Sequence, residues 1–194
     1  MLILARHGRT ASNAAGLLLG RADPSLDELG VAQAGDLARL LAGRPPMRVV
    51  ASPLARTRQT AEALGYPVAV DQRWIELDYG DYDQQPMRDI PLEVWQAWRS
   101  DPGFVPPSGE SLQTMAERVR DACAELAEEA AERDIVVVTH VSPIKAAVAW
   151  ALQVGIEVSW RMHVAPASIT RIAVSPTGPS LVSFGETHHL SSPA

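Results

Sequence analysis

The sequence predicts an α/β fold with a largely parallel central sheet. Short runs rich in β-branched residues alternate along the chain with longer stretches of helical periodicity, which is typical of strands joined by crossover helices. The length of 194 residues suits one domain, and 46% hydrophobic with 21% charged residues indicates a sizeable buried core. We therefore expect residues 1–194 to form a single domain.

The chain begins with a strand and a long helix. The apolar run "LILA" at residues 2–5 predicts the first strand. Asp27 can accept hydrogen bonds at the start of a helix that carries a leucine-rich apolar face, and Gly43 with Pro45 is expected to end this helix.

A second strand is expected at "MRVVAS", residues 47–52. Ser52 and Pro53 then have the pattern of an N-cap and a first helical position, so "LARTRQTAEAL" is predicted to be a helix. A third, short strand is expected at "PVAV", residues 67–70.

The segment 71–110 interrupts the regular alternation. It is rich in Pro, Asp, Trp and Gly, and its only clear periodicity is a short helical stretch at "LEVWQAW". We expect it to form an excursion over one edge of the sheet, beside the active site. A long helix should follow, beginning at Ser108 or Ser111, with Cys123 on its buried apolar stripe.

The last third of the sequence contains the strand expected at the centre of the sheet and the two strands expected to close it. "DIVVVTH", residues 134–140, is apolar without alternation, as expected of a strand buried on both faces. Pro143 is predicted to open the next helix, and "SITRIAV" and "SLVSF" predict two closing strands.

Net charge and cysteine content limit the kinds of binding partner and metal site that the protein can have. The net charge of −6 and the absence of a Lys/Arg run argue against nucleic acid and against membrane binding. Cys123 is the only cysteine, which excludes an internal disulfide and a multi-thiolate zinc site. The run at residues 2–5 is too short for a secretory signal. We expect a cytoplasmic protein.

Cationic and imidazole side chains gather where three strands end. Arg6 and His7 follow the first strand, Arg56 falls in the first turn after the second, and His140 ends "IVVVTH". Because ligands of open α/β sheets bind beyond the carboxyl ends of the strands, we expect these side chains to face one space. A phosphoryl group suits them, since guanidinium groups match phosphate oxygens and Gly8 permits close backbone approach.

Six blocks of sequence carry a family resemblance. "ARHGRTASNAAG", "RADPSLDELGVAQA", "SPLARTRQTAEAL", "WIELDYGDYD", "PPSGES" and "VVTHVSP" occur in the order seen in the histidine phosphatase superfamily, also called phosphoglycerate mutase-like proteins. The chain resembles this family from Ile3 to about Ala173. The resemblance implies a three-layer α/β/α sandwich and phosphoryl transfer through a phosphohistidine, without a metal or other cofactor.

The resemblance also implies roles for individual residues. His7 would be the nucleophile and Glu76 the proton donor. The side chains that would hold the phosphoryl group are Arg6, Asn13, Arg56 and His140.

Two departures from the family pattern concern contacts to substrate. Val141 stands where the family often has glycine after the second histidine, and its backbone N–H can still donate to phosphate. Gln84 and Gln85 replace an acidic residue and a glycine, which leaves the leaving-group contacts open. Trp95 and Trp98 either pack in the core or line the substrate mouth.

The proposed chemistry constrains the protonation of His7. A neutral ring nitrogen must attack phosphorus, so the other ring nitrogen needs an acceptor that fixes the tautomer. Nearby guanidinium groups should lower the pKa of His7 and keep it unprotonated at neutral pH.

We expect a phosphomonoesterase that acts on a small phosphorylated metabolite, and the assembly that we consider is a homodimer. A cofactor-dependent phosphoglycerate mutase is the first alternative, although the stretch "DYDQQPMRDIPLEV" is shorter and more acidic than the basic insertion typical of mutases. The second alternative is an inactive phosphate-binding protein on the same fold. The identity of the substrate stays open because fold does not fix it.

Overall fold

The computed structural model describes residues 1–43, 46 and 48–192. A six-stranded sheet with strand order β3-β2-β4-β1-β5-β6 forms its centre. β1, β2, β3 and β4 are mutually parallel, whereas β5 and β6 are antiparallel to their neighbours. The strands are β1 Leu2–Arg6, β2 Arg48–Ala51, β3 Val68–Val70, β4 Ile135–Thr139, β5 Ile169–Ser175 and β6 Gly178–Glu186. The predicted α/β class with a mostly parallel sheet is confirmed.

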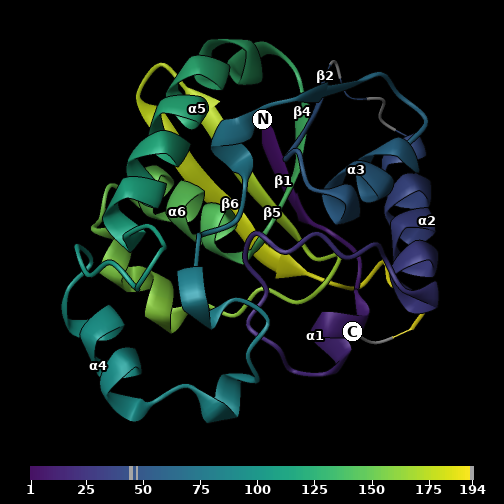
Figure 1. The fold of residues 1–194 in the computed structure, drawn as a ribbon. Helices are drawn as coiled ribbons and strands as arrows, with labels where there is room; N and C mark the ends of the chain where they lie inside the picture. Colours follow the sequence, from purple (N-terminus) through teal and green to yellow (C-terminus); the bar gives the residue numbers. More distant parts are fainter. Residues whose placement is uncertain (44–45, 47, 193–194) are drawn as a thin grey trace.

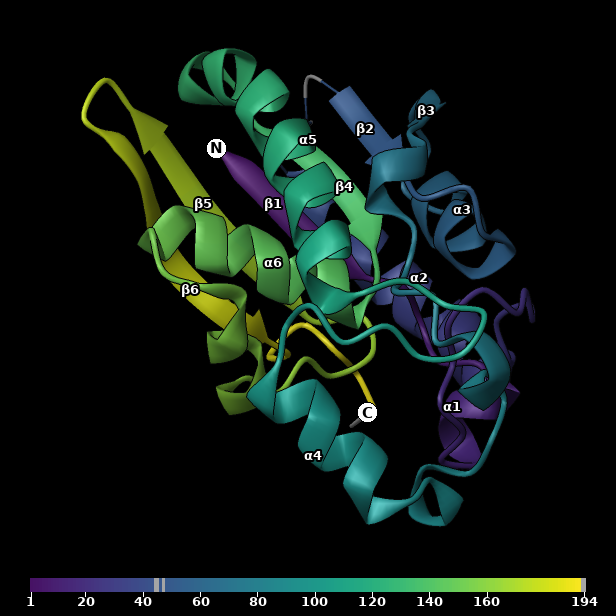
Figure 2. The ribbon, with the colours of Figure 1, turned by 60° about the vertical axis from the view of Figure 1, so that its left-hand side comes forward.

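Helices cover both faces of the sheet (Figures 1 and 2). α5 and α6 lie on one face, and α2 and α3 lie on the other. β4 is buried along its whole length, and its residues alternate between the two cores, with Val137 in one and Val138 in the other. The helices are α1 Ala11–Ala14, α2 Glu28–Ala42, α3 Ala55–Glu62, α4 Leu92–Ser100, α5 Leu112–Glu132 and α6 Val141–Leu152.

Capping side chains explain where the two long helices begin. The Asp27 side chain accepts from the Gly30 backbone N–H at the start of α2, as predicted. Of the two serines considered for α5, Ser111 is the N-cap, and its hydroxyl accepts from the Thr114 N–H. Gly43 caps the end of α2, and Pro45 lies outside the described residues.

Two helix starts differ from the prediction. α3 begins at Ala55 with Leu54 at the N-cap position, so Ser52 is not the cap. α6 begins at Val141, ahead of Pro143, which therefore lies inside the first turn. A proline is compatible with that position because the first N–H groups of a helix have no partner within the helix.

The segment between β3 and α5 forms an excursion at one end of the molecule. It contains three 3₁₀ turns, namely η1 Gln72–Trp74, η2 Gly80–Tyr82 and η3 Met87–Asp89, followed by α4. Figure 2 shows α4 and α1 beyond the carboxyl ends of β1 and β4, where the excursion passes the site described below. Within the described part of the chain, no helix has the length and apolarity needed to cross a bilayer.

Candidate active site

Strand register places two histidines side by side. In the parallel pair β1–β4, Arg6 is opposite Thr139, so His7 and His140 both follow directly after paired positions. Their ring centroids lie 5.1 Å apart at an interplanar angle of 62°. Both side chains are buried, with 3% and 0% of their surface exposed. The sheet therefore brings together two imidazoles that are far apart in the sequence.

The guanidinium of Arg56 lies between the two rings. Its Nε donates to His7 Nε2 at 3.2 Å and to His140 Nδ1 at 3.3 Å. Its two Nη atoms donate to the backbone carbonyls of Ala22 and Gly20, at 2.7 and 2.8 Å. Because a guanidinium can only donate, both ring nitrogens that face it must carry a lone pair.

The remaining ring nitrogens fix the tautomers. His7 Nδ1 lies 2.7 Å from the Gly8 carbonyl oxygen, so this nitrogen carries the proton and Nε2 carries the lone pair. His140 Nε2 lies 2.7 Å from the Ser52 hydroxyl and donates to it, since Nδ1 is the acceptor from Arg56. The predicted acceptor for His7 is thus a backbone carbonyl. Ser52 is a contact that the sequence analysis missed.

Burial and positive charge keep both histidines neutral. Burial lowers the pKa of His7 well below its ordinary value of 6.5, and the charges of Arg56 and Arg6 lower it further. Burial likewise lowers the pKa of His140, with Arg56 again adding to the effect. The expected depression at His7 is therefore present, but desolvation is a larger cause than the guanidinium groups.

Close backbone approach explains the glycine after His7. A Cβ atom at Gly8 would lie 2.4 Å from the carbonyl oxygen of Gly30, in the first turn of α2. Any side chain here would push α2 away from the end of β1. Gly8 thus lets the helix pack directly against the segment that carries His7.

A cavity of about 530 Å³ opens beside His7. Arg6 lines it, donates through Nη1 to the Val164 carbonyl at 2.7 Å, and has a buried Nε–H without a partner among the described residues. Burial lowers the pKa of Arg6 to about 10, so it stays charged at neutral pH. Such a free, buried cationic donor suits an anion.

Asn13 also lines this cavity and offers a donor. Its Oδ1 accepts from the backbone N–H of Thr10 at 3.1 Å and from the Thr10 hydroxyl at 3.0 Å, which fixes the orientation of the amide. Within the described part of the chain, its Nδ2 hydrogens have no partner. The amide hydrogens are therefore available to a ligand, as the sequence analysis predicts.

The carboxylate of Glu76 lies at the N-terminus of α6. It accepts from the N–H groups of Leu77 at 2.8 Å, Val141 at 3.1 Å and Ser142 at 3.2 Å, and it is 3% exposed. These contacts hold Glu76 beside the cavity that it lines. The Val141 N–H therefore already has a partner, and phosphate would have to share this donor with Glu76.

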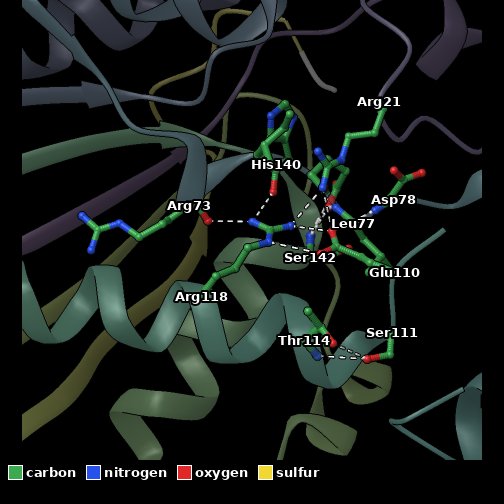
Figure 3. Close-up of polar contacts among 12 residues, drawn as sticks. Arg21, Arg73, Leu77, Asp78, Glu110, Ser111, Thr114, Arg118, His140 and Ser142 are labelled. Atoms are coloured by element: carbon green, nitrogen blue, oxygen red, sulfur yellow. Dashed lines mark hydrogen bonds and ion pairs between the residues drawn. The ribbon is translucent and has the colours of Figure 1, made fainter. Parts of the chain in front are cut away.

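A guanidinium on α5 holds the chain around Glu76 (Figure 3). Arg118 donates to the backbone carbonyls of Arg73, Ile75 and Glu76, at 2.6, 2.8 and 3.2 Å. It also donates to the carboxylate of Glu110 at 2.7 Å.

Glu110 in turn connects the surrounding loops. It accepts from Arg21 at 2.9 Å and from the Asp78 N–H at 3.1 Å. The "PPSGES" block thus contains a structural carboxylate to which the sequence analysis gave no role. Its partners are distant in the sequence, so no local pattern indicates them.

The predicted site residues fall into two groups. Five of them line the cavity: Arg6, His7, Asn13, Glu76 and Val141. Arg56 and His140 are fully buried and contact the His7 ring, Arg56 at Nε2. Gln84 and Gln85 do not line the cavity; their side chains pair with Ser12 and with the Asp81 carbonyl.

Comparison with known proteins shows what the chain is similar to. The model of the histidine phosphatase superfamily, branch 1, matches residues 2–187. The chain spans about half the length of the first curated relatives that it matches. One of these is a bifunctional protein of Mycobacterium tuberculosis, with 35% identity over 179 residues that cover 87% of this chain and 49% of that protein.

Two further relatives are phosphatases by name. The glucosyl-3-phosphoglycerate phosphatase of Mycolicibacterium vanbaalenii is 34% identical over 155 residues, which cover 72% of this chain and 68% of that protein. The structure of a mycobacterial glucosyl-3-phosphoglycerate phosphatase in complex with VO3 superposes with a TM-score of 0.86 at 31% identity, over 96% of this chain and 98% of that one. The chain therefore belongs to branch 1 of the histidine phosphatase superfamily.

Proposed function

We propose that this chain is a phosphomonoesterase that transfers the phosphoryl group of a small phosphate ester first to His7 and then to water. The observation that carries the proposal is the tautomer of His7. Its Nδ1–H is held by the Gly8 carbonyl, and its Nε2 has a lone pair, in a ring that lines the cavity. A buried, neutral imidazole with a fixed lone pair is suited to attack phosphorus.

The first half of the reaction forms a phosphoenzyme. His7 Nε2 forms a bond to phosphorus while the ester P–O bond breaks, and Glu76, which enters this step as the protonated carboxyl group, gives its proton to the departing oxygen. The contact from Arg56 Nε to His7 Nε2 is long and shared with His140, so little hydrogen bonding is lost when the lone pair turns to phosphorus.

The second half regenerates the enzyme. Water attacks phosphorus, the N–P bond breaks with its electron pair returning to His7, and the proton of the water passes to Glu76. The products are the alcohol and inorganic phosphate. Arg6 and Asn13 supply free donors for the equatorial oxygens, which is the main requirement of phosphoryl transfer.

Comparing two leaving groups tests the role of Glu76. An alkoxide needs a proton when it departs, whereas p-nitrophenolate hardly does, so Glu76→Gln should lower kcat on an alkyl phosphate by about 10²–10⁴-fold. The loss on p-nitrophenyl phosphate should be much smaller. Equal losses on both esters would remove Glu76 from this role.

A panel of phosphate esters with phosphate detection tests the function as a whole. We expect inorganic phosphate to be released, at rates unchanged by EDTA. Conversion of 3-phosphoglycerate that requires 2,3-bisphosphoglycerate and releases no phosphate would indicate a mutase instead. An absence of turnover across the panel would indicate a phosphate-binding protein.

A further inference from the structure

A second, smaller cavity adjoins the catalytic one. Its volume is about 180 Å³, and we call it the tryptophan cavity because Trp95, Trp98 and Trp160 form much of its wall. The two cavities share five lining residues, and we call the boundary that these residues form the seam. The shared residues are Leu18, Tyr79, Met87, Val141 and Lys145.

The aromatic side chains that line the tryptophan cavity pack against one another. The Trp95 ring lies 5.4 Å from Trp98 and 6.3 Å from Trp160, and Tyr79 meets Trp98 edge to face at 5.9 Å. An apolar cavity of roughly 150 Å³ accommodates benzene in an engineered protein. The tryptophan cavity is therefore large enough for a six-membered ring.

Two residues that line this cavity carry hydrogen-bond donors without a partner among the described residues. Trp98 is 2% exposed, and its indole N–H has no acceptor among the described residues. The half-buried ammonium group of Lys145 has neither a hydrogen bond nor an ion pair within the same described ranges. Lys145 lines both cavities, so its unpaired ammonium group is available to an acceptor on a ligand.

The position of Lys145 indicates which part of a ligand it meets. Lys145 lies one turn after Val141 on α6, so the two residues share a helix face, and Val141 is in contact with Glu76. Burial lowers the pKa of Lys145, and the nearby Glu76 carboxylate opposes this effect only in part. Lys145 thus lies between Glu76 and the tryptophan cavity.

We propose that Lys145 binds a carboxylate on the leaving group and that the tryptophan cavity takes a ring-sized apolar substituent of the same alcohol. This inference rests on the proposed phosphomonoesterase function and names its substrate class. The substrate is a phosphate monoester of a hydroxy acid that carries an aromatic or similarly bulky apolar side chain. Because Lys145 lies at the seam, the carboxylate belongs near the ester carbon and the ring lies beyond it.

Four probe esters separate the two contributions. Ethyl phosphate has neither group, 2-phospholactate has the carboxylate, 2-phenylethyl phosphate has the ring, and 2-phosphooxy-3-phenylpropanoate has both. We expect kcat/KM to rise by about 10-fold or more with each group, as for a charge-assisted hydrogen bond and for a filled apolar pocket. Similar values for all four esters would overturn the inference while leaving the phosphomonoesterase function intact.

Variants assign each preference to its residue. Lys145→Met should lower the ratio of kcat/KM for carboxylated over uncarboxylated esters by about 10-fold, and Lys145→Arg should largely keep that ratio. A loss of the same size on all esters would mean that Lys145 acts only through Glu76, which contradicts the inference.

A tryptophan pair tests the cavity in the same way. Trp95→Ala should reduce the preference for the ring, whereas Trp150→Ala should not. Trp150 is a matched control because it is also half-buried but lines a different cavity, next to α5. Equal effects of the two substitutions would contradict the assignment of the ring to the tryptophan cavity.

A binding measurement works without turnover. Lys145 is the only lysine in the sequence, so reductive methylation with ¹³C-formaldehyde labels only this side chain and the N-terminal amine. In the NMR spectrum of the His7→Ala protein, 3-phenyllactate should shift the Lys145 signal clearly more than 1-phenylpropan-2-ol, which keeps the ring but lacks the carboxylate. If the chemical shift of the Lys145 signal does not change when 3-phenyllactate is added, the inference is overturned, whether or not any ester is hydrolysed.

Discussion

At the scale of single residues, the protonation of two imidazoles depends on three neighbours. Arg56 faces a lone pair on each ring, while the Gly8 carbonyl and the Ser52 hydroxyl accept the two ring protons. Each of these three neighbours is buried, so water does not take its place as hydrogen-bond partner of the rings. The tautomers are therefore properties of the fold and do not depend on a bound substrate.

Removing the acceptor of His140 tests this arrangement. In Ser52→Ala the buried Nε2–H of His140 loses its partner, which should cost about 1–3 kcal/mol of stability. We also expect a fall in kcat, because His140 shares the Arg56 contact with His7. Urea unfolding and steady-state kinetics measure the two effects.

Ser168→Ala is a suitable control for that substitution. Ser168 is also buried, but its hydroxyl has no partner among the described residues. Its removal should leave stability unchanged or raise it slightly, because no hydrogen bond is lost. Equal destabilisation by the two substitutions would mean that the Ser52 contact contributes nothing specific.

Sequence patterns predict the residues of the site better than their contacts. Arg6, His7, Arg56 and His140 could be placed together because each follows or flanks a strand of a parallel sheet. The partnership of Ser52 with His140 spans 88 positions and depends on the register between β2 and β4. A serine before a proline has a sufficient local explanation as a helix cap, and this explanation was wrong.

At the scale of elements, the start of α5 positions the segment that carries Glu76. Arg118 neutralises Glu110 and at the same time binds three carbonyls of the η1 region. Glu110 lies just before α5 and accepts from Arg21 and the Asp78 N–H. Its pKa is lowered because these donors outweigh the opposing effect of burial. One ion pair thus connects α5 with the loops on two sides of the cavity.

Arg118 should behave as a positioning residue for Glu76. Arg118→Gln leaves several carbonyls without donors, so we expect kcat on an alkyl phosphate to fall by about 10-fold or more, as for a misplaced catalytic group. The loss on p-nitrophenyl phosphate should be smaller, because that ester hardly needs the proton from Glu76. Kinetics on both esters measure this difference.

The neighbouring arginine on α5 provides the control. Arg120 is exposed and has no hydrogen bond or ion pair to any described residue, so Arg120→Gln should leave both rates unchanged. If Arg118→Gln lowers both rates by the same factor, its role is general support of the fold.

Helix starts illustrate the limit of local patterns at this scale. Asp27 and Ser111 were predicted as caps and are caps, because the side chain that caps a helix lies next to it in the sequence. α6 instead begins at Val141 because the Glu76 carboxylate, which is distant in the sequence, accepts from its first N–H groups. A carboxylate at a helix N-terminus is favourable, but sequence spacing does not reveal it.

At the scale of the whole molecule, the parallel sheet determines where the chemistry is. The ends of β1, β2 and β4 bring cationic and imidazole side chains to one edge, and helices on both faces bury them. This much followed from the alternation of strands and helices in the sequence. For the tryptophan cavity, the sequence indicated only that Trp95 and Trp98 either pack in the core or line the substrate mouth. It did not indicate that they meet Trp160 of the η4 turn, Ile156–Arg161, because irregular segments give no periodic signal.

Burial of neutral histidines should make the fold sensitive to mild acid. The pKa values of His7 and His140 are lowered in the folded protein, mainly by burial, so below pH 6.5 the unfolded chain binds protons that the folded chain does not. Stability is therefore fully present above pH 6.5 and falls as pH drops below it. The expected slope is about 1.4 kcal/mol per pH unit for each histidine.

Urea unfolding between pH 6.5 and 5 measures this slope. In His7→Asn one of these protons can no longer be taken up on unfolding, so the slope should fall by about 1.4 kcal/mol per pH unit. His140 and His189, whose pKa is also lowered mainly by burial, contribute equally to both proteins. The carboxylates with lowered pKa values, such as Asp36 and Glu110, titrate below this range. A slope that is the same in both proteins would contradict the neutral state of His7.

In the proposed mechanism the phosphoryl group passes through Nε2 of His7. Trapping the protein with a ³²P-labelled phosphoester, quenching in base and mapping the labelled peptide tests it most directly. We expect acid-labile label on His7, attached at Nε2, and none in His7→Ala. Label at another residue, or label that persists in His7→Ala, would contradict it.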